Sequence, residues 1–172
     1  MRELFRYAMI TVGFRYGAYA AGATWIMALL LFIFKFNPLG EFRLLLSVVT
    51  VVVTVFAMRQ YKLIYNGGQL NLTDGLTVSV TVGLVNALFY SLLVLAWTSI
   101  SPQLWEMHIQ DQLRTLEQGK AIIERNYEAG QLEELKSAIL EQSKSFVALN
   151  AFFFRFIWNI VVGFLTSLYF RS

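Results

Sequence analysis

The chain has no cysteine, a single histidine and few charged residues. Without cysteine it has no disulfide framework, no thiolate nucleophile and no cysteine metal site, and His108 alone supplies neither a histidine-rich metal site nor a catalytic triad. Charged residues make up 15% of the 172 positions and hydrophobic residues 57%. A soluble domain usually carries about 25% charged residues. These scarcities exclude most water-soluble folds.

The few charges are concentrated in one segment. Of the 25 Asp, Glu, Lys and Arg residues, 13 lie between residues 103 and 145. A helix needs about 20 mostly apolar residues to cross a bilayer with every backbone group bonded internally. Four stretches meet this requirement, and they predict spans at about residues 16–34, 39–58, 75–98 and 148–170.

The second predicted span contains a β-branched run, residues 48–55, that looks strand-like. We interpret it as helical because Arg43 and Arg59 flank it at spanning distance. It also lacks the alternating partner strands that a membrane barrel requires.

Capping signals mark the third predicted span. Thr73 or Asp74 is placed to cap its start. Ser101 and Pro102 are typical of the cap and the first residue of a new helix, so the span is expected to end near Thr98.

The segment from about 102 to 145 predicts two amphipathic helices outside the bilayer. It lacks a strand pattern and divides at Ala129 and Gly130, where glycine suits a helix end. Its apolar stripes must cover each other, lie on the membrane or dock on another protein. The candidate docking residues are Leu132, Leu135 and Ile139.

These elements predict an all-α fold in a single membrane domain over residues 1–172. The expected architecture is an integral membrane four-helix bundle with an extramembrane helical hairpin between spans three and four. Lys and Arg residues are nearly balanced between the two sides, but three arginines crowd the first fifteen positions. We therefore expect the termini inside and the hairpin outside.

Small and amide residues within the spans are candidates for helix packing or for a transport pathway. Gly13 and Gly17 form a small-residue face of the first span, and Asn86 and Asn159 lie on polar stripes of spans three and four. Packing is the preferred interpretation, because membrane helices pack and hydrogen-bond through such residues. A path lined by the two polar stripes is the alternative.

Arg155 is the one cation inside the fourth span. Three interpretations are open. Its side chain extends to the lipid headgroups, which we favour; or it bonds internally to Asn86, Asn150 or another span; or it contacts an anionic ligand.

Several functions find no support in the sequence. No Asp or Glu lies in the interior of a predicted span, so proton-coupled export is not expected. No glycine-rich phosphate loop or metal-ligand spacing occurs, and we expect no cofactor, no metal and no enzymatic activity. The net charge of +3 is dispersed, which argues against nucleic acid. The expected partners are the lipid bilayer and either another membrane protein or a second copy of the chain.

The order of features resembles a known family over nearly the full chain. The motifs are Tyr65-Asn66-Gly67-Gly68, Leu72-Thr73-Asp74-Gly75-Leu76, Ile100-Ser101-Pro102-Gln103-Leu104, the charged hairpin, and an apolar last span closed by Arg171. In these features the sequence resembles the bacterial four-span inner-membrane family filed as domain of unknown function 4199. The resemblance implies a bacterial cytoplasmic membrane and this topology, with no catalytic residue. Arg155 inside the last span departs from what it leads us to expect.

The preferred functional hypothesis is a structural or accessory membrane subunit whose hairpin engages a partner. The alternative is a small oligomeric channel or carrier, with Asn86, Arg155 and Asn159 facing the pathway. A membrane-embedded enzyme is a third hypothesis.

Overall fold

The computed structural model describes residues 2–120 and 130–171, with side chains from Tyr7 onward. All secondary structure in these residues is helical. The helices are α1 (Arg2–Ile33), α2 (Arg43–Gln60), the π-helical turn η1 (Tyr61–Tyr65) that continues α2, α3 (Leu72–Ile100), α4 (Pro102–Gln118), α6 (Gln131–Glu141) and α7 (Lys144–Phe170).

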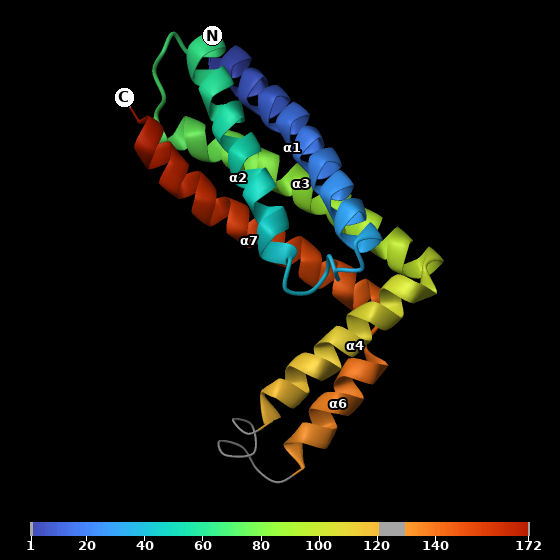
Figure 1. Cartoon of the computed structure of the whole chain (residues 1–172). Coiled ribbons are helices and arrows are strands. Elements are labelled where there is room, and N and C mark those ends of the chain that lie inside the picture. The colour runs from blue at the N-terminus through green and yellow to red at the C-terminus, as the bar shows by residue number, and fades with distance from the viewer. Residues whose placement is uncertain (1, 121–129, 172) are drawn as a thin grey trace.

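Four helical segments are long and apolar enough to cross a membrane: Tyr7–Ile33, Arg43–Tyr65, Leu72–Ile100 and Lys144–Phe170. They form one bundle in which α3 contacts α1, α2 and α7. The start of α1 and the end of α7 lie at the same end of this bundle, and α4 and α6 project from the opposite end (Figure 1). The predicted all-α membrane bundle is confirmed.

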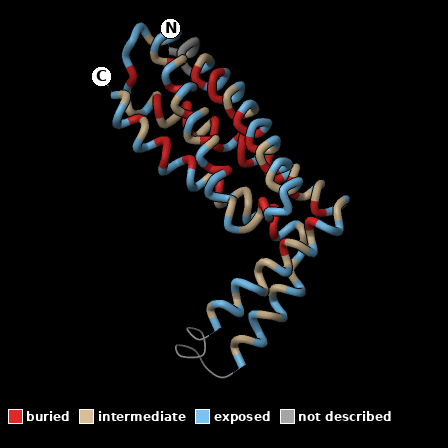
Figure 2. The backbone as a smooth tube through the Cα atoms, viewed as in Figure 1, coloured by how far each residue is buried: buried red, intermediate tan, exposed pale blue. Residues whose placement is uncertain are grey.

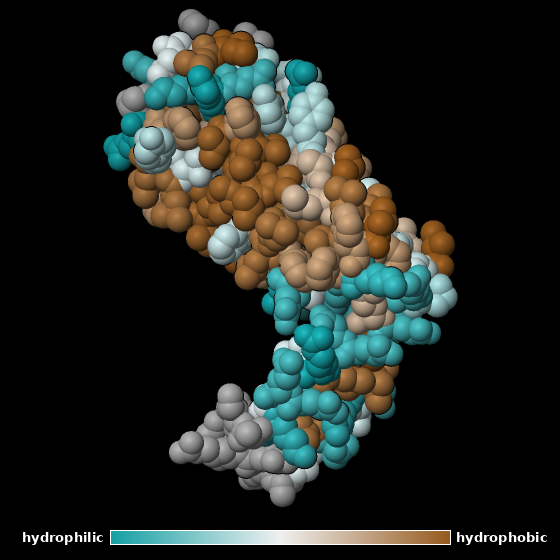
Figure 3. Space-filling model, viewed as in Figure 1, coloured by the Kyte–Doolittle hydropathy of each residue, from teal (hydrophilic) through white to brown (hydrophobic). Residues whose placement is uncertain are grey.

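The bundle buries polar as well as apolar side chains, and its outer surface is apolar. Thr50 and Asn86 are almost completely buried, whereas Ile26, Leu92 and Leu165 are more than half exposed. Buried residues line the interior of the bundle (Figure 2), and its outer face is apolar between hydrophilic ends (Figure 3). Such a surface is suited to lipid, because water would penalise so large an apolar area.

Both ends of helix α2 differ from the bounds of the predicted span. The helix begins at Arg43 rather than near residue 39. Asn37 holds the preceding chain in a turn, because its Oδ1 accepts a hydrogen bond from Leu39 N at 3.0 Å and its carbonyl oxygen accepts one from Gly40 N at 3.3 Å. At the far end η1 extends the helix to Tyr65, past residue 58.

The outer helices also extend beyond the predicted spans. α1 extends to Arg2, well before residue 16, and α7 begins at Lys144 rather than near residue 148. Helix hydrogen bonds are internal, so a helix need not stop where the lipid ends. At the start of α7, Ser143 Oγ accepts a hydrogen bond from Phe146 N at 3.1 Å.

The two capping predictions for α3 and α4 have opposite outcomes. α3 begins at Leu72, so Thr73 and Asp74 lie in its first turn and the prediction that one of them caps it is wrong. At the start of α4 the prediction is confirmed, because Ser101 Oγ accepts a hydrogen bond from Leu104 N at 3.3 Å.

The hairpin helices α4 and α6 pack against each other. Gly130 precedes α6 with a φ of 107°, a conformation that favours glycine. Glu133 and Glu134 occupy the first turn of α6, where negative charge is favourable. The first hairpin helix was expected to end at Ala129, whereas α4 ends at Gln118 and is followed by Gly119. Residues 121–129 lie outside the described part of the chain.

Candidate functional site

The small-residue face of α1 lies directly on α3. A Cβ atom built at Gly17 would lie 2.6 Å from Val85 Cβ and 2.9 Å from the Val82 carbonyl oxygen. One built at Gly13 would lie 2.5 Å from Thr81 Cβ. Larger residues would push the two helices apart, so Gly13 and Gly17 serve close helix packing.

A second seam of small residues joins α3 and α7, which run antiparallel. A Cβ atom built at Gly83 would lie 2.5 Å from Asn159 Cβ, and one built at Gly163 would overlap the side chain of Ser79. Steps of four residues on both helices place the contacts on one line. The seam pairs Gly75 with Ser167, Ser79 with Gly163 and Gly83 with Asn159.

The buried amides bond to hydroxyl groups of α2. Asn86 Nδ2 donates to Thr50 Oγ1 at 3.0 Å, and Thr54 Oγ1 donates to Asn159 Oδ1 at 3.4 Å. Asn159 Nδ2 also donates to the carbonyl oxygen of Arg155 at 3.0 Å. Asn86 and Asn159 each join two helices, which favours packing over a pathway as their role.

The Arg155 side chain lies inside the protein and is only 3% exposed. Its Cζ lies 3.6 Å from the centroid of the Tyr90 ring on α3, a cation–π contact. The interpretation that it extends to the headgroups is therefore wrong. Its Nη1 is buried and has no hydrogen-bond partner among the described residues, so this nitrogen bonds neither Asn86 nor Asn150.

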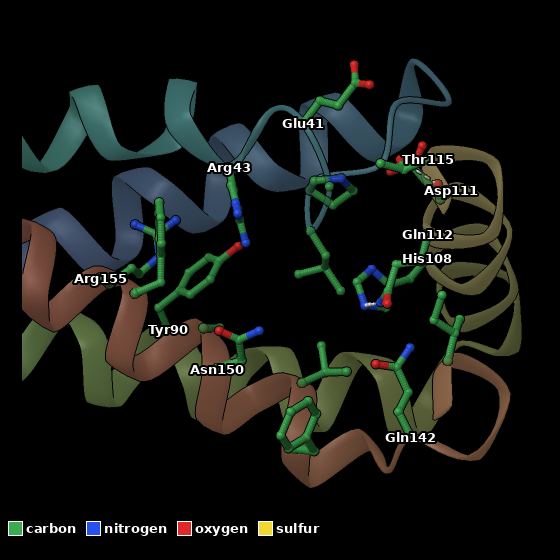
Figure 4. Close-up of a pocket in the computed structure, with 18 of the residues that line it drawn as sticks. Glu41, Arg43, Tyr90, His108, Asp111, Gln112, Thr115, Gln142, Asn150 and Arg155 are labelled. Carbon is green, nitrogen blue, oxygen red and sulfur yellow. Dashed lines mark hydrogen bonds between the residues drawn. The ribbon is translucent and has the colours of Figure 1, made fainter. Parts of the chain in front are cut away.

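A cavity of about 620 Å³ lies beside Arg155, where the bundle meets the hairpin. Figure 4 shows Arg43, Tyr90 and Arg155 on its bundle side, with His108 and Asp111 on α4 across from them. Much of the remaining wall is apolar. These apolar residues are Leu39, Leu116, Ile139, Phe146, Val147, Ala151 and Phe154.

His108 lies in the cavity wall and is 6% exposed. Its Nε2 is 2.6 Å from Gln112 Nε2. Because an amide nitrogen donates, His108 Nε2 accepts, and the neutral imidazole carries its proton on Nδ1. Burial lowers the pKa of His108, Asp111 opposes this shift and Arg43 adds to it. The neutral ring thus has an N–H at Nδ1, and this atom has no partner in the described part of the chain.

The predicted docking residues of α6 do not form one free surface. Leu135 is 43% exposed, whereas Leu132 and Ile139 are half-buried and Ile139 lines the cavity. Since α6 packs against α4, the apolar stripes of the hairpin partly cover each other. Leu140, which the sequence analysis did not select, is 63% exposed.

Sequence reasoning missed Arg43, Tyr90 and His108 as members of one site. They lie on three different helices, and spacing along a chain does not bring such residues together. The available signals were a single histidine and a single cation inside the last span. Within residues 2–120 and 130–171, no group of three or more His, Asp or Glu residues is placed to hold a metal ion.

The fold and its apolar surface define a four-span helical integral membrane protein. A family model described as a protein of unknown function, DUF4199, matches residues 15–170. The chain belongs to this family, and the resemblance drawn from its motifs is confirmed. No curated protein and no solved structure matches the chain.

Proposed function

We propose that the protein is a structural or accessory subunit that engages another membrane protein through its hairpin. The observation that carries this proposal is that the amides of the bundle are used for helix packing. Asn86 Nδ2 bonds Thr50 and Asn159 Oδ1 bonds Thr54, so these groups take part in contacts between helices, whereas Asn86 Oδ1 has no partner among the described residues. Groups bonded in this way do not favour a channel or carrier.

The hairpin supports a docking role. α4 has 17 residues, so at about 1.5 Å per residue it is about 25 Å long and projects well beyond the bundle. Residues 103–145 carry eight acidic and five basic side chains. A partner surface with basic groups beside apolar ones is complementary to this charge and to the exposed Leu135 and Leu140.

We further propose a bacterial inner membrane location with cytoplasmic termini and a periplasmic hairpin. The arginines at the start of α1 support this orientation, because positive residues next to the first span are retained inside. The proposal includes no enzymatic activity and no nucleic-acid partner.

The test is to extract the tagged full-length chain from its native membrane in mild detergent and to measure particle mass and co-purifying proteins. We expect a stoichiometric second membrane protein. Replacing Leu135 and Leu140 together by Ser is expected to reduce its recovery at least about tenfold, as loss of an interface anchor does. Ile100→Ser is the matched control, since Ile100 is 81% exposed outside the hairpin. A bare homo-oligomer, or a partner that the double variant retains, would contradict the proposal.

A further inference from the structure

The cavity between bundle and hairpin is lined by unpaired donors. Arg155 Nη1, His108 Nδ1 and Gln142 Nε2 are buried and have no hydrogen-bond partner among the described residues. All three residues line this cavity. Buried donors in native proteins are normally paired, so three at one cavity indicate an occupant that supplies acceptors.

Positive charge is concentrated at the bundle side of the cavity. Arg43, the first residue of α2, lies there with the buried Arg155 (Figure 4). Asp111 lies across the cavity, and its Oδ2 accepts a hydrogen bond from Asn37 Nδ2 at 3.0 Å. Glu41, on the turn before α2, is exposed and also lines the cavity. The two arginines contact aromatic rings, and the unpaired Arg155 Nη1 is suited to an anion.

The cavity lies where a membrane lipid would present its headgroup. Arg43 Cζ is 4.6 Å from the centroid of the Phe154 ring, so the start of α2 is level with the residue that precedes Arg155. The cavity therefore extends from the helix ends into the bundle. Its wall toward α7 is mostly apolar, with Phe146, Val147 and Ala151 beside the polar Asn150. A volume of about 620 Å³ also falls in the range of sites for organic molecules, well above the need of a single inorganic anion.

We propose that this cavity binds an anionic amphiphile from the bilayer. Its phosphate or carboxylate group lies against Arg43 and Arg155, where the planar guanidinium groups suit such oxyanions. The His108 and Gln142 donors bond further acceptors of the headgroup region, and the first part of the acyl chain lies against the apolar wall. A free phosphate shares the anionic chemistry, but the apolar wall favours the lipid. The residues of this lipid site differ from Leu135 and Leu140, which the proposed partner contacts. The two proposals are therefore independent.

The test uses the purified full-length protein in detergent, with native mass spectrometry after addition of phosphatidylglycerol, phosphatidylcholine or inorganic phosphate. We expect one bound phosphatidylglycerol and at least about tenfold less phosphatidylcholine. Arg43→Gln and Arg155→Gln are each expected to weaken phosphatidylglycerol binding about tenfold or more, through loss of a charge-assisted contact. Arg59→Gln is the matched control, because Arg59 is exposed near the other end of α2 and should leave binding unchanged.

Arg43→Gln keeps the test decisive even if Arg155→Gln does not fold. Arg43 is exposed, so Arg43→Gln is expected to fold even where the buried Arg155→Gln does not. Equal retention of the two lipids, or full phosphatidylglycerol binding by folded Arg43→Gln, would overturn the proposal. Binding of inorganic phosphate that phosphatidylglycerol does not displace would also overturn it, in favour of a soluble anion.

Discussion

The bundle and the hairpin distribute polar and apolar side chains in opposite ways. In the bundle, Asn86 and Asn159 are buried and large apolar side chains cover the surface. In the hairpin, Glu133 and Glu134 are exposed, while Leu132 is half-buried in the region where α6 packs on α4. The difference reflects two solvents, because lipid rewards internal polar bonds and water rewards external charge. The cost of a substitution should therefore depend on the region in which it falls.

The largest effect is expected where bundle helices touch through glycine. Gly17→Val would place side-chain atoms in the space of Val85 and the Val82 carbonyl oxygen. We expect the free energy of unfolding to fall by about 1–3 kcal/mol, as overpacking does. Gly22→Val on the same helix is the control, because nothing lies within 4 Å of a Cβ built there. Thermal unfolding in detergent measures both, and an equal loss would remove the packing argument.

A smaller effect is expected at the buried amides. Asn159→Leu removes the bond from Thr54 and the bond to the Arg155 carbonyl oxygen, and should cost about 1 kcal/mol. Thr166→Val is the control, since Thr166 Oγ1 donates to Val162 O within its own helix. Unfolding in denaturant compares the two variants, and solute flux into vesicles tests the alternative role. Flux that Asn159→Leu abolishes in a fully stable protein would favour a carrier.

The junction of the two regions should respond to acid. Because burial lowers the pKa of His108, the unfolded chain takes up a proton near the ordinary pKa of about 6.5 while the folded chain does not. The buried neutral His108 makes its full contribution to the free energy of unfolding above that pH. This contribution declines as the pH falls below it. His108→Phe removes this decline, with the charges of Asp111 and Arg43 still in place. Melting temperatures above and below pH 6.5 measure the effect, and an unchanged decline in the variant would show that another group causes it.

The smallest effect is expected on the water-exposed face of the hairpin. Lys136 Nζ lies 2.8 Å from Glu133 Oε1, and this hydrogen bond raises the pKa of Lys136. Lys136→Met should nevertheless leave the melting temperature unchanged within error, because exposed pairs contribute little. A loss as large as that of Asn159→Leu would erase the contrast between the regions.

The features that sequence alone predicted are local or depend on composition. The Ser101 cap needs only Pro102 and Leu104, which follow it in the chain, and four spans follow from apolar length. The bounds of helix α2 differ from those of the predicted span, because the turn before it depends on hydrogen bonds of Asn37. Arg155 was misplaced because the ring that covers it, Tyr90, belongs to another helix.

We expect the bundle to lie in lipid and the hairpin to lie in water, on the side opposite the termini. The chain has no cysteine, so Ser137→Cys on α6 and Gln69→Cys in the loop before α3 each introduce a single reactive site. An impermeant thiol reagent is applied to intact cells and again after lysis. We expect labelling of Ser137→Cys in intact cells and of Gln69→Cys only after lysis. Equal labelling of both variants in intact cells would contradict the separation, and the reverse pattern would contradict the proposed orientation.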